Sequence, residues 1–352
     1  MHLSPLSHRQ VSKDRLFFGV IKMTIALEKK WIWDSWYHKE GDVWHGYFLQ
    51  ADKSLIDPEL RHLNVSQAHA ISKDLIHWEH LGTCFEPSTT TAWDDSTTWT
   101  GSVVKDDDGL YHLFYTGTCL AEKSLYQRVG HAISDDLHNW KRVGDGLCLD
   151  IIGENAQYYE DQHQVGHWHD RAMRDPWVMK NPNGKGWLMY FTARAPGIEE
   201  PNAGGAIGFA TSDDLYHWEL QKPVFVGGFG QLEVPQVFEL EGRWYCLFCT
   251  SSSHWADAFI KARVGKPVTG NHYLVADNPE GPWSLPESEF LDGDEPCYRY
   301  AARILQTDTG PVIIGFHDQG PNGFVGEILD PVAVHVNDEG LLSTDNNNKK
   351  GQ

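Results

Sequence analysis

The sequence predicts an all-β fold, a five-bladed β-propeller of four-stranded antiparallel blades. One observation is a recurring segment in which Ser-x-Asp-Leu precedes a tryptophan; three close copies lie at residues 70–78, 132–140 and 210–218, and a looser one lies at 275–283. Another is a hairpin pattern before each copy and once more after the last. A supersecondary unit that recurs in this way indicates blades packed around an axis, which leaves few sheet edges exposed.

The hairpins follow one another along the chain with the same internal order, an apolar stretch, a turn and an aromatic stretch. The paired stretches are 31–37 with 44–49, 102–105 with 111–115, 177–179 with 187–191, 237–240 with 244–249, and 300–305 with 312–317. Each intervening turn contains a glycine, which supplies the backbone freedom that tight turns need. A loop then leads to a third strand, the Ser-x-Asp turn and a fourth strand that ends near the tryptophan.

The recurring segment itself is interpreted as architecture. An aspartate in a turn accepts hydrogen bonds from the backbone two residues further on, so the Asp of each copy should cap its turn. The large indole at the end of each copy should wedge between neighbouring blades. These expectations concern Asp74, Asp136 and Asp214, and Trp78, Trp140 and Trp218.

Three segments follow from this pattern. Residues 31–342 form the propeller, residues 1–30 form a leader that is poorly ordered or peripheral, and residues 343–352 form a polar, disordered tail. Lys22 interrupts the apolar stretch from Leu16 to Leu27, and no small residues end it, so it does not match a signal peptide. The six cysteines lack the spacing of a disulfide framework or a metal site. We therefore expect free thiols and a cytoplasmic protein.

The charge of the chain excludes two classes of partner. It has 49 acidic and 29 basic residues and a formal net charge of −20, which repels nucleic-acid backbones and anionic lipid. The sequence contains no run of 18 apolar residues that could span a bilayer. A neutral small molecule is the expected ligand, and the sequence leaves the oligomeric state open.

Three acids stand at equivalent places in the predicted blades. Asp34, Asp175 and Glu233 lie at the start of the first strand of the first, third and fourth blades. First strands line the central channel of a propeller, so we expect these acids to converge. Two carboxyl groups that face one another across a sugar suffice for glycoside hydrolysis, provided that one is held protonated by its surroundings and the other is held ionised.

Residues beside these acids are candidates for binding a sugar. The indoles of Trp33, Trp36 and Trp99 offer flat apolar faces, although tryptophans in strands commonly belong to a core. Arg174 presents a fork of donors to sugar hydroxyls, or forms a salt bridge with its neighbours. A metal site built from His163, His167 and His169 is a further alternative, but these residues lie in a long loop that we expect to shape the rim of the site.

At these residues the sequence resembles glycoside hydrolase families 32 and 68, the β-fructofuranosidases, invertases and levansucrases. Residues 33–36, Trp-Asp-Ser-Trp, are similar to the nucleophile motif of family 68, and residues 174–176 match the Arg-Asp-Pro motif of both families. Residues 233–235, Glu-Val-Pro, resemble the acid/base motif, and residues 99–104 resemble the substrate-binding Ser-Gly-Ser segment. Residues 69–78 are very similar to family 32, and the resemblance covers about residues 31 to 330.

The resemblance implies a retaining enzyme that acts on β-fructofuranosides such as sucrose by way of a fructosyl-enzyme, with transfer to sugar acceptors as a second outcome. It implies Asp34 as nucleophile, Glu233 as acid/base and Asp175 as the stabiliser of the transition state. It also implies substrate contacts from Arg174, Gln50, Trp99 and Ser102, and neither a cofactor nor a metal. Too few residues follow the propeller for the β-sandwich that family 32 appends, so we expect a propeller alone.

Two alternatives stay open. Family 43 arabinofuranosidases and xylosidases share the five-bladed fold and three acids, but they invert configuration and hold their two carboxyl groups about 6.5–9.5 Å apart, against about 5–5.5 Å for retention. A propeller that binds sugar without catalysis is the other alternative.

Overall fold

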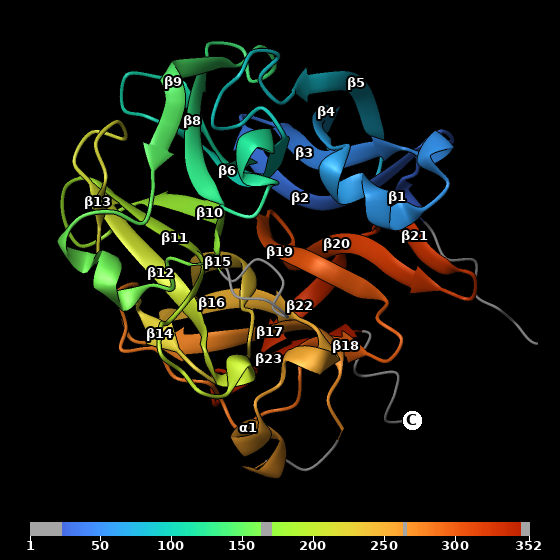
Figure 1. Cartoon of the computed structure of the whole chain (residues 1–352). Helices are drawn as coiled ribbons and strands as arrows, with labels where there is room; N and C mark the ends of the chain where they lie inside the picture. The colour runs from blue at the N-terminus through green and yellow to red at the C-terminus, as the bar shows by residue number, and fades with distance from the viewer. Residues whose placement is uncertain (1–22, 163–170, 263–265, 346–352) are drawn as a thin grey trace, which may run out of the picture.

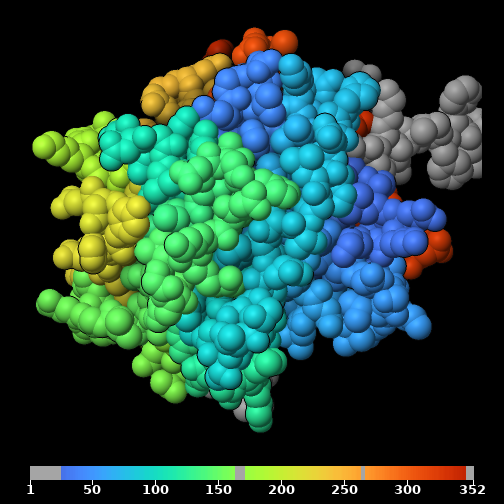
Figure 2. Space-filling model, turned by 90° about the horizontal axis from the view of Figure 1, so that it is seen from above, coloured from blue at the N-terminus to red at the C-terminus, as the bar shows by residue number. Residues whose placement is uncertain are grey.

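The computed structural model describes residues 23–162, 171–262 and 266–345. These residues form five antiparallel sheets arranged in chain order around a common axis (Figure 1). The predicted five-bladed propeller is thus confirmed, and every strand of the described residues belongs to one of its five sheets. Seen from above, the first three blades lie side by side along one flank of the molecule (Figure 2).

Each of the first four blades runs outward from the axis along the chain. Blade 1 contains β2 (Lys30–Glu40), β3 (Val43–Asp52), β4 (Ser66–Ser72) and β5 (Trp78–Phe85). Blade 2 contains β6 (Thr97–Lys105), β7 (Tyr111–Thr118), β8 (Arg128–Ser134) and β9 (Lys141–Leu149). Blade 3 contains β10 (Met173–Lys180), β11 (Trp187–Arg194) and β12 (Gly205–Ser212), and two short strands, β13 (Glu219–Leu220) and β14 (Phe225–Val226), share its outer edge. Blade 4 contains β15 (Glu233–Leu240), β16 (Arg243–Thr250), β17 (Thr269–Ala276) and β18 (Asp292–Asp294), with the helix α1 (Asp257–Ala262) after β16.

The fifth blade is built from both ends of the described chain. Its inner strands are β19 (Arg299–Thr307) and β20 (Gly310–Gly320), and β20 pairs with both β21 (Gly323–Leu329) and β22 (Val332–Val336). The outer strand β23 (Leu342–Thr344) pairs with β22, whereas β1 (Met23–Ile25) pairs with β21. Figure 1 shows β1, at the blue end of the colour scale, beside the red β21. The first strand therefore closes the ring onto the last blade.

This closure shifts the domain bounds that the sequence suggested. The chain enters the propeller at Met23 rather than at residue 31, and β23 extends to Thr344, beyond the expected start of the tail at residue 343. Ile25 is buried in the core beneath the first blade. The predictions for residues 1–22 and 346–352 lie outside the described residues.

The Ser-x-Asp turns have the predicted capping geometry. The carboxylate of Asp136 accepts hydrogen bonds from the backbone N–H groups of His138 (2.9 Å) and Asn139 (2.8 Å), and those of Asp74 and Asp214 repeat the arrangement. The leucine after each aspartate adopts a left-handed conformation, which Leu137 shows at a φ of 64°. The repeat in the sequence is therefore a repeat of one tight turn.

Two of the three tryptophans join neighbouring blades as predicted. The ring of Trp140 meets the edge of Tyr47 in blade 1 at 6.0 Å, and Trp218 meets Phe114 in blade 2 at 5.5 Å. Trp78 instead packs on Tyr37 of its own blade. The tryptophan also stands at or just before the start of the fourth strand, not at its end, since Trp78 begins β5 and Trp140 precedes β9.

The innermost strand of every blade is interrupted by a β-bulge at the same level. The pairing register skips one or two residues in each of β2, β6, β10, β15 and β19, between Trp33 and Ser35, Trp99 and Gly101, Arg174 and Trp177, Glu233 and Gln236, and Tyr300 and Arg303. A bulge turns side chains out of the regular alternation and frees backbone groups from the ladder. All five bulges lie beside the axis, where they set the directions in which the neighbouring side chains point.

Candidate active site

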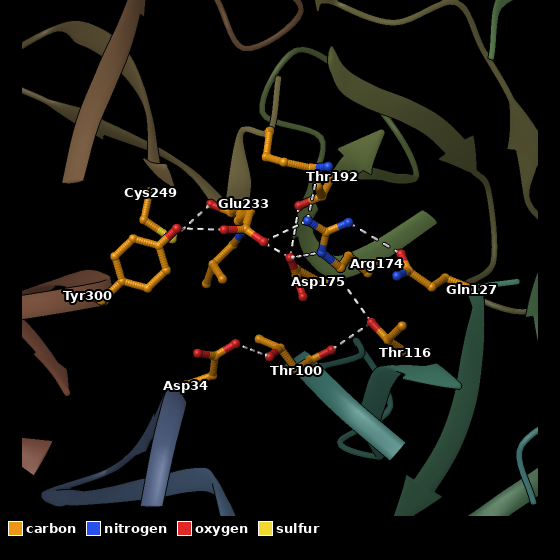
Figure 3. A network of polar contacts seen from close by, with 12 residues as sticks. Asp34, Thr100, Thr116, Gln127, Arg174, Asp175, Thr192, Glu233, Cys249 and Tyr300 are labelled. Carbon is orange, nitrogen blue, oxygen red and sulfur yellow. Dashed lines mark hydrogen bonds and ion pairs between the residues drawn. The ribbon is translucent and has the colours of Figure 1, made fainter. Parts of the chain in front are cut away.

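The three acids meet in one cavity at the axis of the propeller. Asp34 from β2, Asp175 from β10 and Glu233 from β15 all line a cavity of about 760 Å³. Figure 3 shows the three carboxyl groups directed toward a shared space from different strands. Trp33, Trp99 and Arg174 also line this cavity. The convergence expected from the sequence is therefore present in the structure.

Asp34 is the extra residue of the bulge in β2. Its Oδ2 accepts a hydrogen bond of 2.5 Å from the hydroxyl of Thr100, which is the extra residue of the bulge in β6. Burial and the nearby Asp175 and Glu233 raise the pKa of Asp34 to about 7, although Thr100 and Arg303 act in the opposite direction. A free Asp34 therefore holds a proton readily near neutral pH.

Asp175 is fixed from several sides in a left-handed conformation with a φ of 57°. Its Oδ2 accepts from the hydroxyl of Thr192 (2.9 Å) and from the N–H of Val234 (3.1 Å), and its own N–H donates to Thr116 (2.8 Å). Burial raises the pKa of Asp175, and Arg174 opposes that shift. The strained backbone and three partners hold this carboxyl group in one orientation.

Glu233 accepts a side-chain hydrogen bond on each of its two carboxyl oxygens. One oxygen accepts from Arg174 at 2.7 Å and the other from the hydroxyl of Tyr300 at 2.6 Å. Burial acts to raise the pKa of Glu233, but Arg174, His254 and Tyr300 outweigh it and lower that pKa. The sequence-based hypothesis expected a protonated acid and an ionised nucleophile. The donors around Glu233 instead favour its ionised form, and the surroundings of Asp34 favour its protonated form.

The comparison with known proteins decides the family. A model of the glycosyl hydrolase family 32 N-terminal domain matches residues 35–319. The chain belongs to glycosyl hydrolase family 32.

Two curated proteins are similar to this chain in sequence, and a solved structure shares its fold. The sucrose-6-phosphate hydrolase of Bacillus subtilis is 28% identical over 257 residues, which are 70% of this chain and 47% of that protein. The levanase of a Bacillus species is 26% identical over 265 residues, 69% of this chain and 24% of that protein. The chain thus spans less than half the length of these relatives. The levansucrase of Bacillus subtilis shares the fold with a TM-score of 0.70 at 18% identity, over 92% of this chain and 88% of that protein.

Three residues expected to contact substrate in this family 32 chain do not line the cavity. Trp36 is fully buried and stacks on Tyr47 with ring centroids 5.9 Å apart. Gln50 is buried and donates to Ser66 and Thr83 on the neighbouring strands, at 3.1 and 2.8 Å, while Leu49 faces the cavity instead. Strand geometry directs both side chains into the blade, so the structure does not bring them to the cavity in which their contact with substrate was predicted.

Ser102 is the third. It is buried, and its hydroxyl accepts the N–H of Val178 at 3.1 Å, which ties blade 2 to blade 3. Its predicted contact with substrate is therefore replaced by a contact between blades.

Several cavity residues were missed by the sequence analysis. Tyr300 stands at the start of the first strand of blade 5 and lines the cavity. The three acids were identified by the same position in their own blades, so a search of that position for tyrosine as well as for acids would have identified Tyr300. Thr100 lies inside the segment 99–104, which resembles the substrate-binding segment of the family. Arg61, His62 and His254 come from loops whose lengths vary between blades, and no repeat marks them.

The metal hypothesis finds no site in the part of the chain that the structure describes. Residues 23–162, 171–262 and 266–345 contain no group of three or more His, Cys, Asp or Glu side chains placed to hold a metal ion. The proposed ligands His163, His167 and His169 lie outside these ranges. Among the helices in the same ranges, none is long and apolar enough to cross a membrane.

Proposed function

We propose that this family 32 protein cleaves β-fructofuranosides, such as sucrose or a short fructoside, with retention of configuration. The observation that carries the proposal is the meeting of Asp34, Asp175 and Glu233, from three blades, around one cavity. A retaining glycosidase needs a carboxylate nucleophile and a carboxylic acid beside the scissile bond. The relatives, named as a sucrose-6-phosphate hydrolase and a levanase, support fructosides as the substrate class.

The reaction takes place in two displacements. Asp34 attacks carbon C2 of the fructosyl unit, the bond from C2 to the leaving oxygen breaks, and Glu233 gives its proton to that oxygen. The fructosyl unit is then bound to Asp34 as an ester. Glu233, now a carboxylate, takes a proton from water, whose oxygen attacks C2 and releases fructose and free Asp34. A sugar hydroxyl in place of water gives transfer instead of hydrolysis.

Substrate binding has to move a proton toward Glu233. Arg174 donates to Glu233 and also lies 3.4 Å from Asp175, so hydroxyl groups of the fructosyl ring that bind Arg174 compete with Glu233 for the same donors. Loss of that donor raises the pKa of Glu233, because its charged form loses a partner. The nucleophile Asp34 keeps its hydrogen bond from Thr100, which favours its ionised form. The substrate thus prepares the acid and the nucleophile for their roles.

The remaining lining favours a neutral sugar. Trp33 and Trp99 offer flat apolar walls, and a cavity of about 760 Å³ is large enough for a disaccharide. Among the described residues, the lining carries five carboxyl groups and three basic side chains, which disfavours a phosphorylated substrate. The carboxyl groups are Asp34, Glu59, Asp175, Glu233 and Asp318, and the cations are Arg61, Lys123 and Arg174. We therefore propose sucrose rather than its phosphate as the better substrate.

The test is a substrate panel with a matched inactive variant. The protein is incubated with sucrose, sucrose 6-phosphate, raffinose, inulin and an aryl arabinofuranoside, and free glucose and fructose are measured separately. We expect turnover of sucrose, weaker turnover of its phosphate, and loss of at least about 10³-fold of kcat in Asp34→Asn with an unchanged melting temperature. An excess of glucose over fructose reports transfer. Turnover of the arabinofuranoside alone, or full activity of Asp34→Asn, contradicts the proposal.

A further inference from the structure

A buried arginine lies beside the acids without lining their cavity. Arg303 belongs to β19 of the fifth blade, and its side chain is 1% exposed. Within the described residues, the acceptors of its hydrogen bonds are backbone carbonyl oxygens, and its Nη2 has no hydrogen-bond partner. A buried guanidinium is costly unless its surroundings compensate the charge.

The carbonyls that Arg303 binds belong to the bulges that carry the nucleophile and the acid/base. Its Nε donates to the oxygen of Ser35 at 3.4 Å, and its Nη1 donates to the oxygens of Val234 at 3.1 Å and Pro235 at 2.7 Å. Ser35 follows Asp34, and Val234 follows Glu233. The strand pairing skips Asp34 in β2, and Val234 and Pro235 in β15, and a bulge frees backbone groups from the ladder. One planar guanidinium thus joins these two strands.

The charge of Arg303 also acts on the cavity. Its guanidinium opposes the rise in the pKa of Asp34. Burial lowers the pKa of Arg303 to about 10, against the effect of the two nearby aspartates, so the group stays charged at neutral pH. Its carbon Cζ lies 5.2 Å from the centre of the Trp177 ring. The titratable groups that face it are Asp34 and Tyr37 on β2, Asp175 on β10, and Cys246 and Cys249 on β16.

We propose that Arg303 is a positioning residue that sets the separation between the carboxyl groups of Asp34 and Glu233. This inference rests on the proposed function. Retention requires that the nucleophile and the acid lie about 5–5.5 Å apart. The pairing register skips Asp34 in β2 and skips Val234 and Pro235 in β15, and the fork of Arg303 binds the carbonyl oxygens of Ser35, Val234 and Pro235 across the gap between these two strands. A displacement of about 1 Å at a reacting group costs about 100-fold in rate.

Two variants separate the fork from the charge. Arg303→Lys keeps a cation but loses the planar fork, whereas Arg303→Gln loses the cation. For sucrose turnover we expect Arg303→Lys to lower kcat by about tenfold or more, with KM within about twofold and an unchanged pH profile. We expect Arg303→Gln to lower kcat as well and to move both limbs of the pH profile upward, because Asp34 then holds its proton more tightly.

The matched control is Arg299→Lys in the same strand. Arg299 is equally buried, and it pairs with Asp292 at 2.5 Å outside the cavity. We expect this variant to lower the melting temperature while kcat and the pH profile stay native. A folded Arg303→Lys with native kcat overturns the inference, and Arg303→Lys alone decides if Arg303→Gln does not fold.

Failure of the proposed function is recognised separately. Absence of fructoside turnover in the native protein contradicts that function. In that case, crystal structures of the native protein and of Arg303→Lys test the role of Arg303. A changed distance between the carboxyl groups of Asp34 and Glu233 then supports the inference. An unchanged distance overturns it.

Discussion

At the scale of single residues, the reactivity of the candidate site depends on which of its three buried acids holds a proton. Asp34, Asp175 and Glu233 repel one another when all are ionised, and burial adds to the cost. Arg174 and Tyr300 stabilise the charge of Glu233, so Asp34 is the acid that holds the proton before substrate binds. Because the groups interact, their titration belongs to the cluster as a whole.

This arrangement predicts the pH dependence of the reaction. Burial and the nearby acids raise the pKa of Asp34 to about 7. Above that pH Asp34 no longer holds a proton that substrate binding can move to Glu233, so we expect kcat/KM for sucrose to fall by about tenfold per pH unit. At lower pH a second proton neutralises the nucleophile, so activity falls again. A pH profile of kcat/KM checks this, and a rate that keeps rising well above pH 7 would contradict it.

Tyr300 offers a second prediction at this scale. Tyr300→Phe removes the 2.6 Å hydrogen bond to Glu233 and retains the ring that packs on Phe316. A hydrogen bond to a charged group contributes about 1.5–3 kcal/mol, and Glu233 becomes charged as it gives up its proton in the reaction. We therefore expect kcat to fall by about ten- to a hundredfold and the melting temperature to fall as well. Tyr298→Phe, at a neighbouring tyrosine outside the cavity, is the control and should keep native kcat. Equal activities of the two variants would remove the role of Tyr300.

At the scale of elements, the bulges explain where prediction from the sequence fails. Regular alternation along β2 places Asp34 and Trp36 on the same face, so a cavity-facing Asp34 implies a cavity-facing Trp36. The bulge at Asp34 reverses the alternation after it, and Trp36 enters the core while Trp33 lines the cavity. The bulge at Thr100 likewise places Trp99 beside the cavity and Ser102 between blades. The acids could be predicted from their residue types. The bulges could not, because no residue type in the sequence marks a bulge, and the directions of the side chains after each bulge were therefore not predictable.

The Ser-x-Asp turns were predictable because their chemistry is local. The backbone donors that Asp136 binds lie within three residues of it. Asp136→Ala leaves those N–H groups without their acceptor, so we expect a loss of about 1–2 kcal/mol in the free energy of unfolding. Asp135→Ala, at its exposed neighbour in the same turn, should change that free energy by less than about 0.5 kcal/mol. Chemical denaturation measures both, and equal values would show that the cap contributes nothing.

At the scale of the whole molecule, the propeller is closed by pairing between β1 and β21. This closure was not predictable from the sequence, because β1 is only three residues long and carries no copy of the repeat. Ring closure depends on contacts between distant parts of the chain, which local patterns do not report. The pattern of blades, by contrast, was predictable because each blade repeats the same local signals. The cytoplasmic location stays a prediction.

Ile25 tests the contribution of this closure. It is 6% exposed and belongs to the core cluster that includes blade 1. Ile25→Ala should lower the free energy of unfolding by about 2–4 kcal/mol, because it removes buried apolar contacts and loosens the pairing of β1 with β21. Glu28→Ala, at an exposed position just after β1, should have little effect. A melting curve of Ile25→Ala that matches the native one would show that β1 does not stabilise the ring.

The stereochemistry of transfer tests the central claim, that Asp34 and Glu233 act as a retaining pair. Sucrose is incubated with the protein in dilute methanol, and the methyl fructofuranoside formed is identified by NMR before it can be hydrolysed. Retention through a fructosyl-enzyme predicts the β-anomer in the native protein and no product in Asp34→Asn. Formation of the α-anomer, or formation of the β-anomer at the native rate by Asp34→Asn, would contradict the account.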